Sequence, residues 1–389
     1  MRAFLATFLL GLALFGGAFA FTQLVANNRY LGLSSTTLQL WAHSLPEPPA
    51  AGESELIREA VRRARIYDDQ IQSHHLLVDG MLVNRTLAGN MLDECDSLLF
   101  SSLRYVSLHK LGFNDRAQAA WDGIQNSQEN GRWLRHPRCT KSTSRDMILG
   151  LLAALSQKPP GFTGYLHRLM QHVQKHNGYF GKGPIYVSYL SPGLAQIIAL
   201  LAVEGKIPAQ DVPKIIRDGY STHEIELYVV RLGFEAHLNA LTIWLEMELT
   251  HNRDETPNTL ARSMDGLIAP FGPGHIEDQR TDWITSRLLE LEPHNLFIRY
   301  LRLEAANALT PAVSARLLAE LLAMPEFPHD RLPMDCDRPA DYLWQRTWHP
   351  YKLLVPKSCT QEYNGADYLW MASLLVERLR QPPTVRFSH

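Results

Sequence analysis

The sequence predicts an all-α protein. Apolar residues recur at helical spacing through most of the chain from residue 53 onward, a pattern typical of amphipathic and buried helices. Strand signals are almost absent, because only residues 184–190 alternate plausibly between apolar and polar side chains. No segment repeats at the interval of about 33–34 residues that is typical of TPR and ankyrin arrays. These observations favour roughly a dozen helices, joined largely as hairpins.

Composition and charge narrow the class of protein. A chain of 389 residues is long enough to bury a sizeable core. Hydrophobic residues make up 46% of it and charged residues 20%, which indicates a globular protein without long disordered tracts. Lys and Arg number 38 against 40 for Asp and Glu, a formal net charge of -2. This balance gives no electrostatic reason to expect nucleic acid as a partner.

The first 20 residues predict export. Arg2 precedes an apolar run, residues 3–20, that ends in Ala18-Phe19-Ala20, as in a secretory signal peptide. The run is also long enough to remain as an uncleaved anchor, which would associate the protein with the inner membrane. In both cases the rest of the chain is expected to be periplasmic or extracellular. Residues 21–52 are a predicted linker, broken by Pro46, Pro48 and Pro49.

Residues 53–389 are predicted to form a single helical domain. Residues 92–111 and 117–124 flank a turn and form an αα-hairpin. Residues 144–156 and 224–250 are apolar on more than one side, so these helices are expected to pack on several faces. The remaining predicted helices cover residues 53–71, 165–176, 193–204, 212–218, 259–268, 283–291, 295–308, 311–323, 340–348 and 365–379. Such a set, half of it buried on two faces, fits a closed double ring of helices.

Three segments add a resemblance to a known architecture. They are Asp93-Glu94-Cys95-Asp96, which opens a helix; Ser144-Arg145-Asp146, which opens another after a loop rich in Trp, Arg and His; and Tyr363-Asn364-Gly365-Ala366-Asp367-Tyr368-Leu369-Trp370. The chain resembles (α/α)6-toroid proteins of the six-hairpin glycosidase type, over residues 53–379 and at the level of architecture alone. It matches no family's full catalytic signature. The resemblance implies a carbohydrate-active enzyme with its site in the loops at one end of the ring.

Three carboxylates are the candidates for acid–base chemistry: Asp96, Asp146 and Glu235. Asp96 closes an acidic cluster at the edge of an apolar run, where repulsion can raise a carboxyl pKa. Glu235 lies between two apolar stripes of a predicted helix, where a carboxylate must be paired or have a raised pKa. A glycoside hydrolase generally uses two carboxylates. We expect Asp96 or Asp146 to be one of them and Glu235 the other.

Each of these residues also has a purely structural interpretation. Acidic residues in the first turn of a helix stabilise its dipole, which would account for the group of Asp93, Glu94 and Asp96, with Asp96 as the expected exception. The spacing Thr143-x-x-Asp146 fits a capping box. Glu235 can belong to a core ion pair with Arg231 or with an arginine of another inner helix. In these interpretations the carboxylates stabilise the fold and have no catalytic role.

Side chains suited to sugar binding lie near these carboxylates in the sequence. Trp and Arg planes stack on sugar rings or bind acidic groups, and a histidine can act as an acid or a base. An Arg at a helix N-terminus opposes the helix dipole, so a carboxylate or an anionic substrate group should compensate it. The predicted substrate-binding residues are Asp93, Trp133, Arg135, His136, Arg145, His237 and Trp348.

The cysteines and the missing motifs complete the prediction. Four cysteines in an exported chain favour disulfides; sequence order suggests Cys95–Cys139 and Cys336–Cys359, one of three pairings, and four free thiols are the alternative. The chain has no GxSxG, Walker A, GxGxxG in a strand-to-helix context or HExxH pattern. We therefore expect no cofactor and no metal.

The predicted function is that of a glycoside hydrolase acting on a polysaccharide or oligosaccharide. A lyase acting on an acidic polysaccharide is a variant of this prediction, with His136 or a tyrosine as the base. The alternative from another class is a non-catalytic envelope protein that binds a glycan or a protein partner, because fold alone does not fix function.

Overall fold

The structure is a computed structural model. It describes residues 52–73, 77–83, 85, 90, 97–129, 131–138, 143–182, 187–220, 235–251, 281, 284–289, 295–323 and 365–381, all of which belong to one compact unit, residues 46–389. The predicted leader, the linker up to residue 51, the four cysteines and Trp348 lie outside the described residues. Within these ranges, no helix has the length and apolar character needed to cross a membrane.

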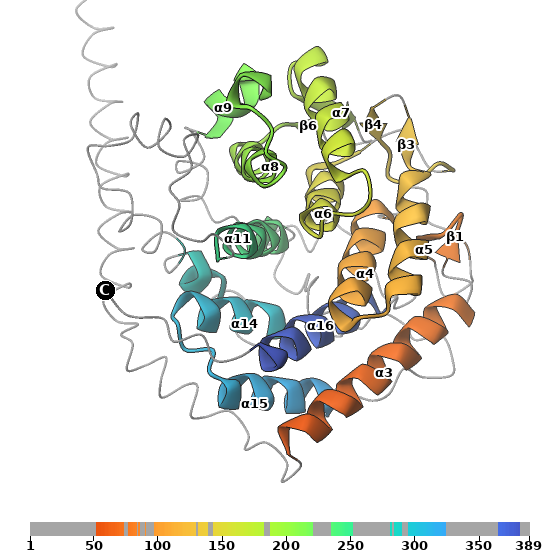
Figure 1. Cartoon of the computed structure of the whole chain (residues 1–389), viewed down its shortest axis with the longest axis vertical. Helices are drawn as coiled ribbons and strands as arrows, with labels where there is room; N and C mark the ends of the chain where they lie inside the picture. Colours follow the sequence, from red (N-terminus) through yellow and green to blue (C-terminus); the bar gives the residue numbers. More distant parts are fainter. Residues whose placement is uncertain are drawn as a thin grey trace, which may run out of the picture. The chain divides into compact units, whose positions relative to one another are not determined.

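The described part is predominantly helical, which confirms the predicted class (Figure 1). In chain order its helices are α3 (Glu53–Ser73), α4 (Ser97–Leu111), α5 (Asn114–Gln125), α6 (Arg145–Ser156), α7 (Phe162–Lys175), α8 (Pro192–Glu204), the 3-10 helix η1 (Ala209–Asp211), α9 (Lys214–Tyr220), α11 (Glu235–His251), α14 (Leu296–Ala305), α15 (Pro311–Leu322) and α16 (Ala366–Arg380).

Three short antiparallel hairpins interrupt the helices. They are β1 (Leu77–Val78) with β2 (Met81–Leu82), β3 (Gln128–Glu129) with β4 (Arg132–Trp133), and β5 (Tyr179–Lys182) with β6 (Val187–Tyr189). The sequence indicated only the last strand. Strands of two residues are too short to show an alternating pattern, so the first two hairpins gave no signal.

Wholly buried helices alternate with helices that bury one face. In α4 every residue except His109 and Lys110 is buried, and α6, α8, α14 and α16 are buried along most of their length. In contrast, α3, α5, α7 and α15 keep an exposed face. In Figure 1, α3 lies alongside α15 and α16, against which it packs. The apolar sequences of α6 and α8 account for their burial on all sides, whereas α14 also buries Arg299, Arg302 and Glu304.

The buried helices run in the same direction. Five side-chain contacts join their C-terminal ends. His109 of α4 contacts Gln157 after α6, and Lys158 after α6 pairs with Glu204 of α8 at 2.8 Å. Lys110 of α4 pairs with Glu248 of α11 at 2.6 Å and with Glu377 of α16 at 2.5 Å, and Glu304 of α14 pairs with Arg378 of α16 at 3.6 Å. Towards the N-terminal side, Gly150 in the middle of α6 meets Leu99 near the start of α4, and Phe297 near the start of α14 meets Trp370 in the second turn of α16. The amphipathic helices between them return the chain.

The two ends of this parallel set differ in their connections. At the C-terminal ends the chain turns within residues 112–113, 157–161 and 306–310. At the N-terminal ends the connections between consecutive described helices include residues 74–96, 126–144 and 176–191. All three β-hairpins belong to these longer connections. Binding and catalytic residues are disproportionately found on loops that a rigid scaffold positions, so the N-terminal end is the first place to look for a site.

Candidate functional site

Asp146 lies at the N-terminal end of the buried helices, as the second residue of α6. Its carboxylate is half-buried, and its Oδ1 accepts a hydrogen bond from the Ser144 hydroxyl. Ser144 Oγ in turn accepts from Arg135 Nη2 at 2.9 Å. Arg135 is only 3% exposed. One hydroxyl therefore connects a buried guanidinium to Asp146 and fixes the direction in which the carboxylate points.

This cluster of Arg135, Ser144 and Asp146 differs from the predicted capping box. The N-cap of α6 is Ser144, whose side chain makes no capping hydrogen bond. Thr143 is buried, and within the described part of the chain its hydroxyl has no hydrogen-bond partner. The Ser144 side chain does not cap the helix because its hydroxyl is already engaged by Arg135 and Asp146. A Thr143 cap therefore does not account for Asp146.

Trp133 and His136, which precede this cluster's helix in the sequence, are core residues. Trp133 is buried on β4, and its ring centroid lies 5.7 Å from that of Tyr165. His136 is fully buried; its Nε2 lies 3.0 Å from the Val78 carbonyl oxygen, and its Nδ1 accepts from the Arg138 backbone N–H at 3.1 Å. These partners assign a neutral ring with the proton on Nε2. Both ring systems are buried in the core and present no surface on which a sugar could stack.

Of the other predicted residues, some begin α6 or α11, and the others lie outside the described part of the chain. Arg145 is the half-buried first residue of α6, and His237 is half-buried in the first turn of α11. Glu235 is the first residue of α11, and its side chain lies outside the described part. Because α6 packs against α11 and the two run in parallel, these starting turns belong to the same end. Asp93 and Asp96 lie outside the described residues, and α4 begins directly after them at Ser97.

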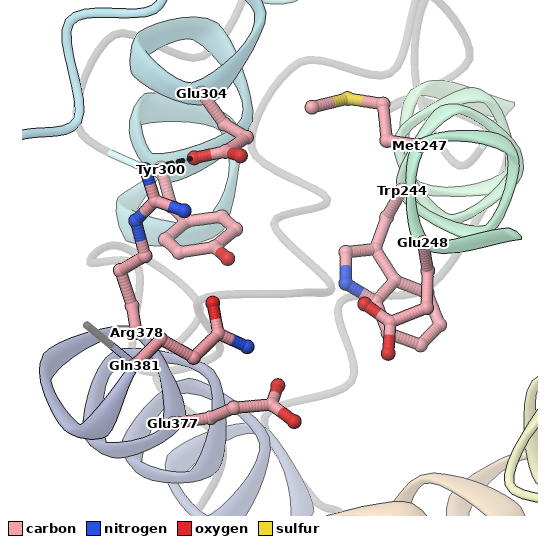
Figure 2. Close-up of a pocket in the computed structure, with 8 residues that line it drawn as sticks. All are labelled: Trp244, Met247, Glu248, Tyr300, Glu304, Glu377, Arg378 and Gln381. Carbon is pink, nitrogen blue, oxygen red and sulfur yellow. Dashed lines mark ion pairs between the residues drawn. The ribbon is translucent and has the colours of Figure 1, made fainter. Parts of the chain in front are cut away.

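A second constellation lies at the opposite end, between the last turns of α11, α14 and α16 (Figure 2). It surrounds a cavity of about 240 Å³, which we call the C-terminal cavity. Its lining consists of Trp244, Met247, Glu248, Tyr300, Glu304, Glu377, Arg378 and Gln381. Figure 2 shows the side chains of α14 and α16 facing those of α11 across the open space. Lys110 of α4 adjoins this lining, because it pairs with Glu248 and Glu377.

The charges at the C-terminal cavity are strongly coupled. Burial raises the pKa of Glu377, and the neighbouring Glu248 adds to this effect, although Lys110 opposes it. Burial by itself would lower the pKa of the Lys110 ammonium, but Glu248 and Glu377 together hold it above its usual value. Burial, followed by the charges of Glu304, Glu248 and Glu377, raises the pKa of Tyr300 far above its normal range. Tyr300 is therefore a neutral hydroxyl at physiological pH.

Sequence reasoning missed the C-terminal cavity because its lining residues come from three separate helices and share no spacing. One signal was present in the sequence. Glu248, Glu304 and Glu377 each fall in the last turn of a helix, where the negative end of the dipole disfavours a carboxylate. Repeated violations of a local rule often mark a functional position.

Neither end offers a metal centre within the described part of the chain, where no group of three or more His, Cys, Asp or Glu side chains could hold a metal ion. The comparisons with known proteins give no match: no protein-family model and no curated protein matches this sequence.

Proposed function

We propose that this chain is an exported α/α-toroid protein that hydrolyses glycosidic bonds in a polysaccharide or oligosaccharide. The proposal rests on one observation above all. Within the described part of the chain, the buried helices α4, α6, α8, α14 and α16 run in parallel with α11. Arg135, Arg145, Asp146 and the start of α11 occur at the N-terminal end of this set. A double ring of helices requires this alternation of parallel buried helices with returning outer ones.

The chemistry assigned to this end uses Asp146 and Glu235, with Asp96 as the alternative to Asp146. Asp146 is an acceptor towards Ser144, an arrangement that suits a general base or a nucleophile. Glu235 would then supply the proton to the leaving oxygen. A separation of about 5–5.5 Å between the two carboxyl groups would give retention of configuration, and about 6.5–9.5 Å would give inversion.

Arg135, Ser144 and Arg145 are proposed to support catalysis by orienting Asp146 and the substrate. Arg135, locked in the core, holds Ser144 against Asp146, so the carboxylate keeps one orientation as substrate binds. Arg145 adjoins Asp146 in the chain and is half-buried. Its guanidinium suits a bidentate contact with an acidic sugar. An anionic polysaccharide is thus the proposed substrate. If the enzyme were a lyase instead of a hydrolase, it would cleave this polysaccharide by elimination, without adding water.

The test is mass spectrometry of the products formed when the oxidised, leaderless protein is incubated with a panel of neutral and acidic polysaccharides. Fragments that have gained water indicate a hydrolase, and unsaturated ends indicate a lyase. We expect Asp146→Asn to lower the rate by at least about 100-fold, because general acid–base catalysis contributes about 10²–10⁴.

Asp115→Asn is the matched control, since Asp115 is likewise the second residue of a twelve-residue helix, α5, and is exposed. For Glu235→Gln the control is Glu53→Gln, which changes the exposed first residue of α3. Both controls should retain the wild-type rate. Absence of products across the whole panel from folded wild-type protein would favour the non-catalytic binding protein. An unimpaired Asp146→Asn variant would remove Asp146 from the mechanism.

A further inference from the structure

Tyr189 places a large aromatic ring in solvent. Its exposed fraction is 56%, and among the described residues it is the single large hydrophobic side chain that is exposed. It lies on β6, where the two-residue alternation of a strand directs Ser188 to the interior and Tyr189 outward. The interior side of the hairpin is occupied by Phe180, which is 2% exposed. The core therefore does not use the outer face of the Tyr189 ring, and a ligand can pack on it.

The β5–β6 hairpin holds this ring in a fixed position. Tyr179 and Tyr189 lie directly opposite each other in the strand pair, and their ring centroids are 5.6 Å apart with an angle of 60° between the ring planes. The Leu190 N–H donates to the Gly178 carbonyl oxygen at 2.7 Å. The Tyr179 N–H donates to the His176 carbonyl oxygen at 3.0 Å, which ties β5 to the end of α7. Because the ring is already oriented, a ligand that packs on it loses little affinity to ordering it.

The same hairpin adjoins the residues that precede Asp146. A Cβ atom on Gly181 of β5 would lie 2.9 Å from the Thr143 backbone nitrogen and 3.3 Å from its carbonyl oxygen, so a glycine is required for this close approach. Tyr179 precedes Gly181 by two strand residues, or about 7 Å. Asp146 follows Thr143 by three residues, or at most about 10 Å. A polysaccharide chain bound at Asp146 can therefore extend to Tyr189, on the strand opposite Tyr179.

An isolated ring of this kind suits a sugar better than a protein surface. The exposed residues of the adjoining turn, His176 and Asn177, are polar, whereas a stable protein interface needs a contiguous patch and buries about 800 Å² on each partner. The face of an aromatic ring carries partial negative charge, and the C–H groups on one face of a pyranose carry partial positive charge. The two faces therefore attract each other, while the hydroxyl groups at the edge of the sugar stay in water.

We propose that Tyr189, supported by Tyr179, forms an outer subsite that stacks on one sugar ring of the polysaccharide cleaved at Asp146. This inference rests on the proposed function, because the ligand is the substrate of that function. It adds that the bound substrate extends beyond the cleaved bond as far as the β5–β6 hairpin. Chains that reach Tyr189 bind more tightly than fragments that end before it.

Native affinity electrophoresis tests this binding without relying on catalysis. The folded protein is run through gels that contain polygalacturonate or alginate, which are acidic, or hydroxyethylcellulose, which is neutral, and we expect at least one of them to retard the wild type. Tyr189→Leu keeps an apolar side chain but removes the aromatic face, so its apparent dissociation constant should rise about three- to tenfold. Tyr189→Phe keeps the ring and should bind within about twofold of the wild type.

Kinetics and a matched control complete the test. On a probe that the wild type cleaves, Tyr189→Leu should raise KM about three- to tenfold and change kcat far less, since it removes binding shared by the ground and transition states. Gln174→Leu introduces the same side chain at an exposed position of α7 and should leave retardation unchanged.

The outcomes separate this proposal from the proposed function. No retardation of the wild type by any of the three probes, or equal retardation of the wild type and Tyr189→Leu, would overturn the subsite. Retardation that depends on Tyr189, without products from any polysaccharide, would support the sugar-binding ring and count against the hydrolase. Products together with an unchanged KM in Tyr189→Leu would remove the subsite and leave the hydrolase.

Discussion

At the scale of single residues, His136 shows how a chemically versatile side chain serves a structural role. Its two ring nitrogens bind the Val78 carbonyl and the Arg138 backbone N–H. Arg138 in turn pairs with Asp79 in the β1–β2 turn through two hydrogen bonds, at 2.7 and 2.5 Å. His136 therefore fastens the β1–β2 hairpin to the connection that leads into α6.

Replacing His136 by alanine should destabilise the fold by about 1–3 kcal/mol, because two buried backbone groups lose their partner. Urea unfolding followed by circular dichroism measures this change. His167→Ala, in the half-buried part of α7, is the comparison and should cost less. A wild-type unfolding midpoint for His136→Ala would contradict the structural role.

His172 predicts a pH dependence of stability. Burial, followed by the positive charges of His176 and Arg132, lowers its pKa from 6.5 to about 4. The folded state thus keeps His172 neutral, whereas the unfolded chain takes up a proton near its normal pKa. Because the unfolded state binds more protons between these two values, stability should decrease as the pH falls from about 6.5 to about 4.

Thermal unfolding across this pH interval checks the prediction. A His172→Gln variant cannot take up that proton, so its melting temperature should fall less steeply than that of the wild type as the solution is acidified. Parallel curves for the two proteins would show that His172 makes no contribution to the acid sensitivity.

At the scale of elements, a glycine sets the closest approach between two buried helices. A Cβ atom on Gly150 of α6 would lie 2.7 Å from the Leu99 Cα and 2.8 Å from its Cδ1 on α4. A side chain at this position would force the helices apart. The crossing also helps to position Asp146, which lies one turn before Gly150 on α6.

Gly150→Ala should therefore lower stability by about 1–3 kcal/mol through overpacking, despite the better helix propensity of alanine. Gly164→Ala on α7 is the opposite case. Its nearest contact would be the flexible end of Arg168, at 3.4 Å, so alanine should stabilise by up to about 1 kcal/mol. Chemical denaturation of both variants measures the change in the free energy of unfolding. A change of the same sign in both variants would contradict the packing argument.

At the scale of the whole molecule, Lys110 connects three helices that are distant in sequence. Its side chain is 3% exposed, and it joins the end of α4 to α11 and to α16. Lys110→Met should destabilise by about 2–4 kcal/mol, somewhat below the usual cost of breaking a buried ion pair, because both carboxylates are partly in solvent.

Adding Glu248→Gln and Glu377→Gln to Lys110→Met should recover part of the lost stability, since the variant then leaves no unpaired carboxylate at this position. Denaturant unfolding of the single, double and triple variants forms the required cycle. If the triple variant were less stable than Lys110→Met alone, the carboxylates would have a further stabilising role that the pairing with Lys110 does not explain.

Much of the helical content was predictable because it depends on local pattern. The helix expected at residues 144–156 is α6, at residues 145–156, and the one expected at residues 311–323 is α15. Pro192 and Pro311 each stand at the start of a helix, after the capping residues Ser191 and Thr310, and these are signals that a sequence displays directly. The start of α5 was expected three residues too late, because Asn114 and Asp115 were assigned to the turn.

The sequence alone determined that this chain is helical and that residues 144–156 form a buried helix, because apolar spacing and capping act between neighbours along the chain. It also marked Arg135, Arg145 and Asp146 as unusual. Only the tertiary structure decided that the buried helices run in parallel, that Trp133 and His136 lie in the core, and that three C-terminal glutamates surround one cavity. These properties depend on contacts between residues far apart in the chain, such as Lys110 with Glu377. Local sequence patterns do not predict such contacts.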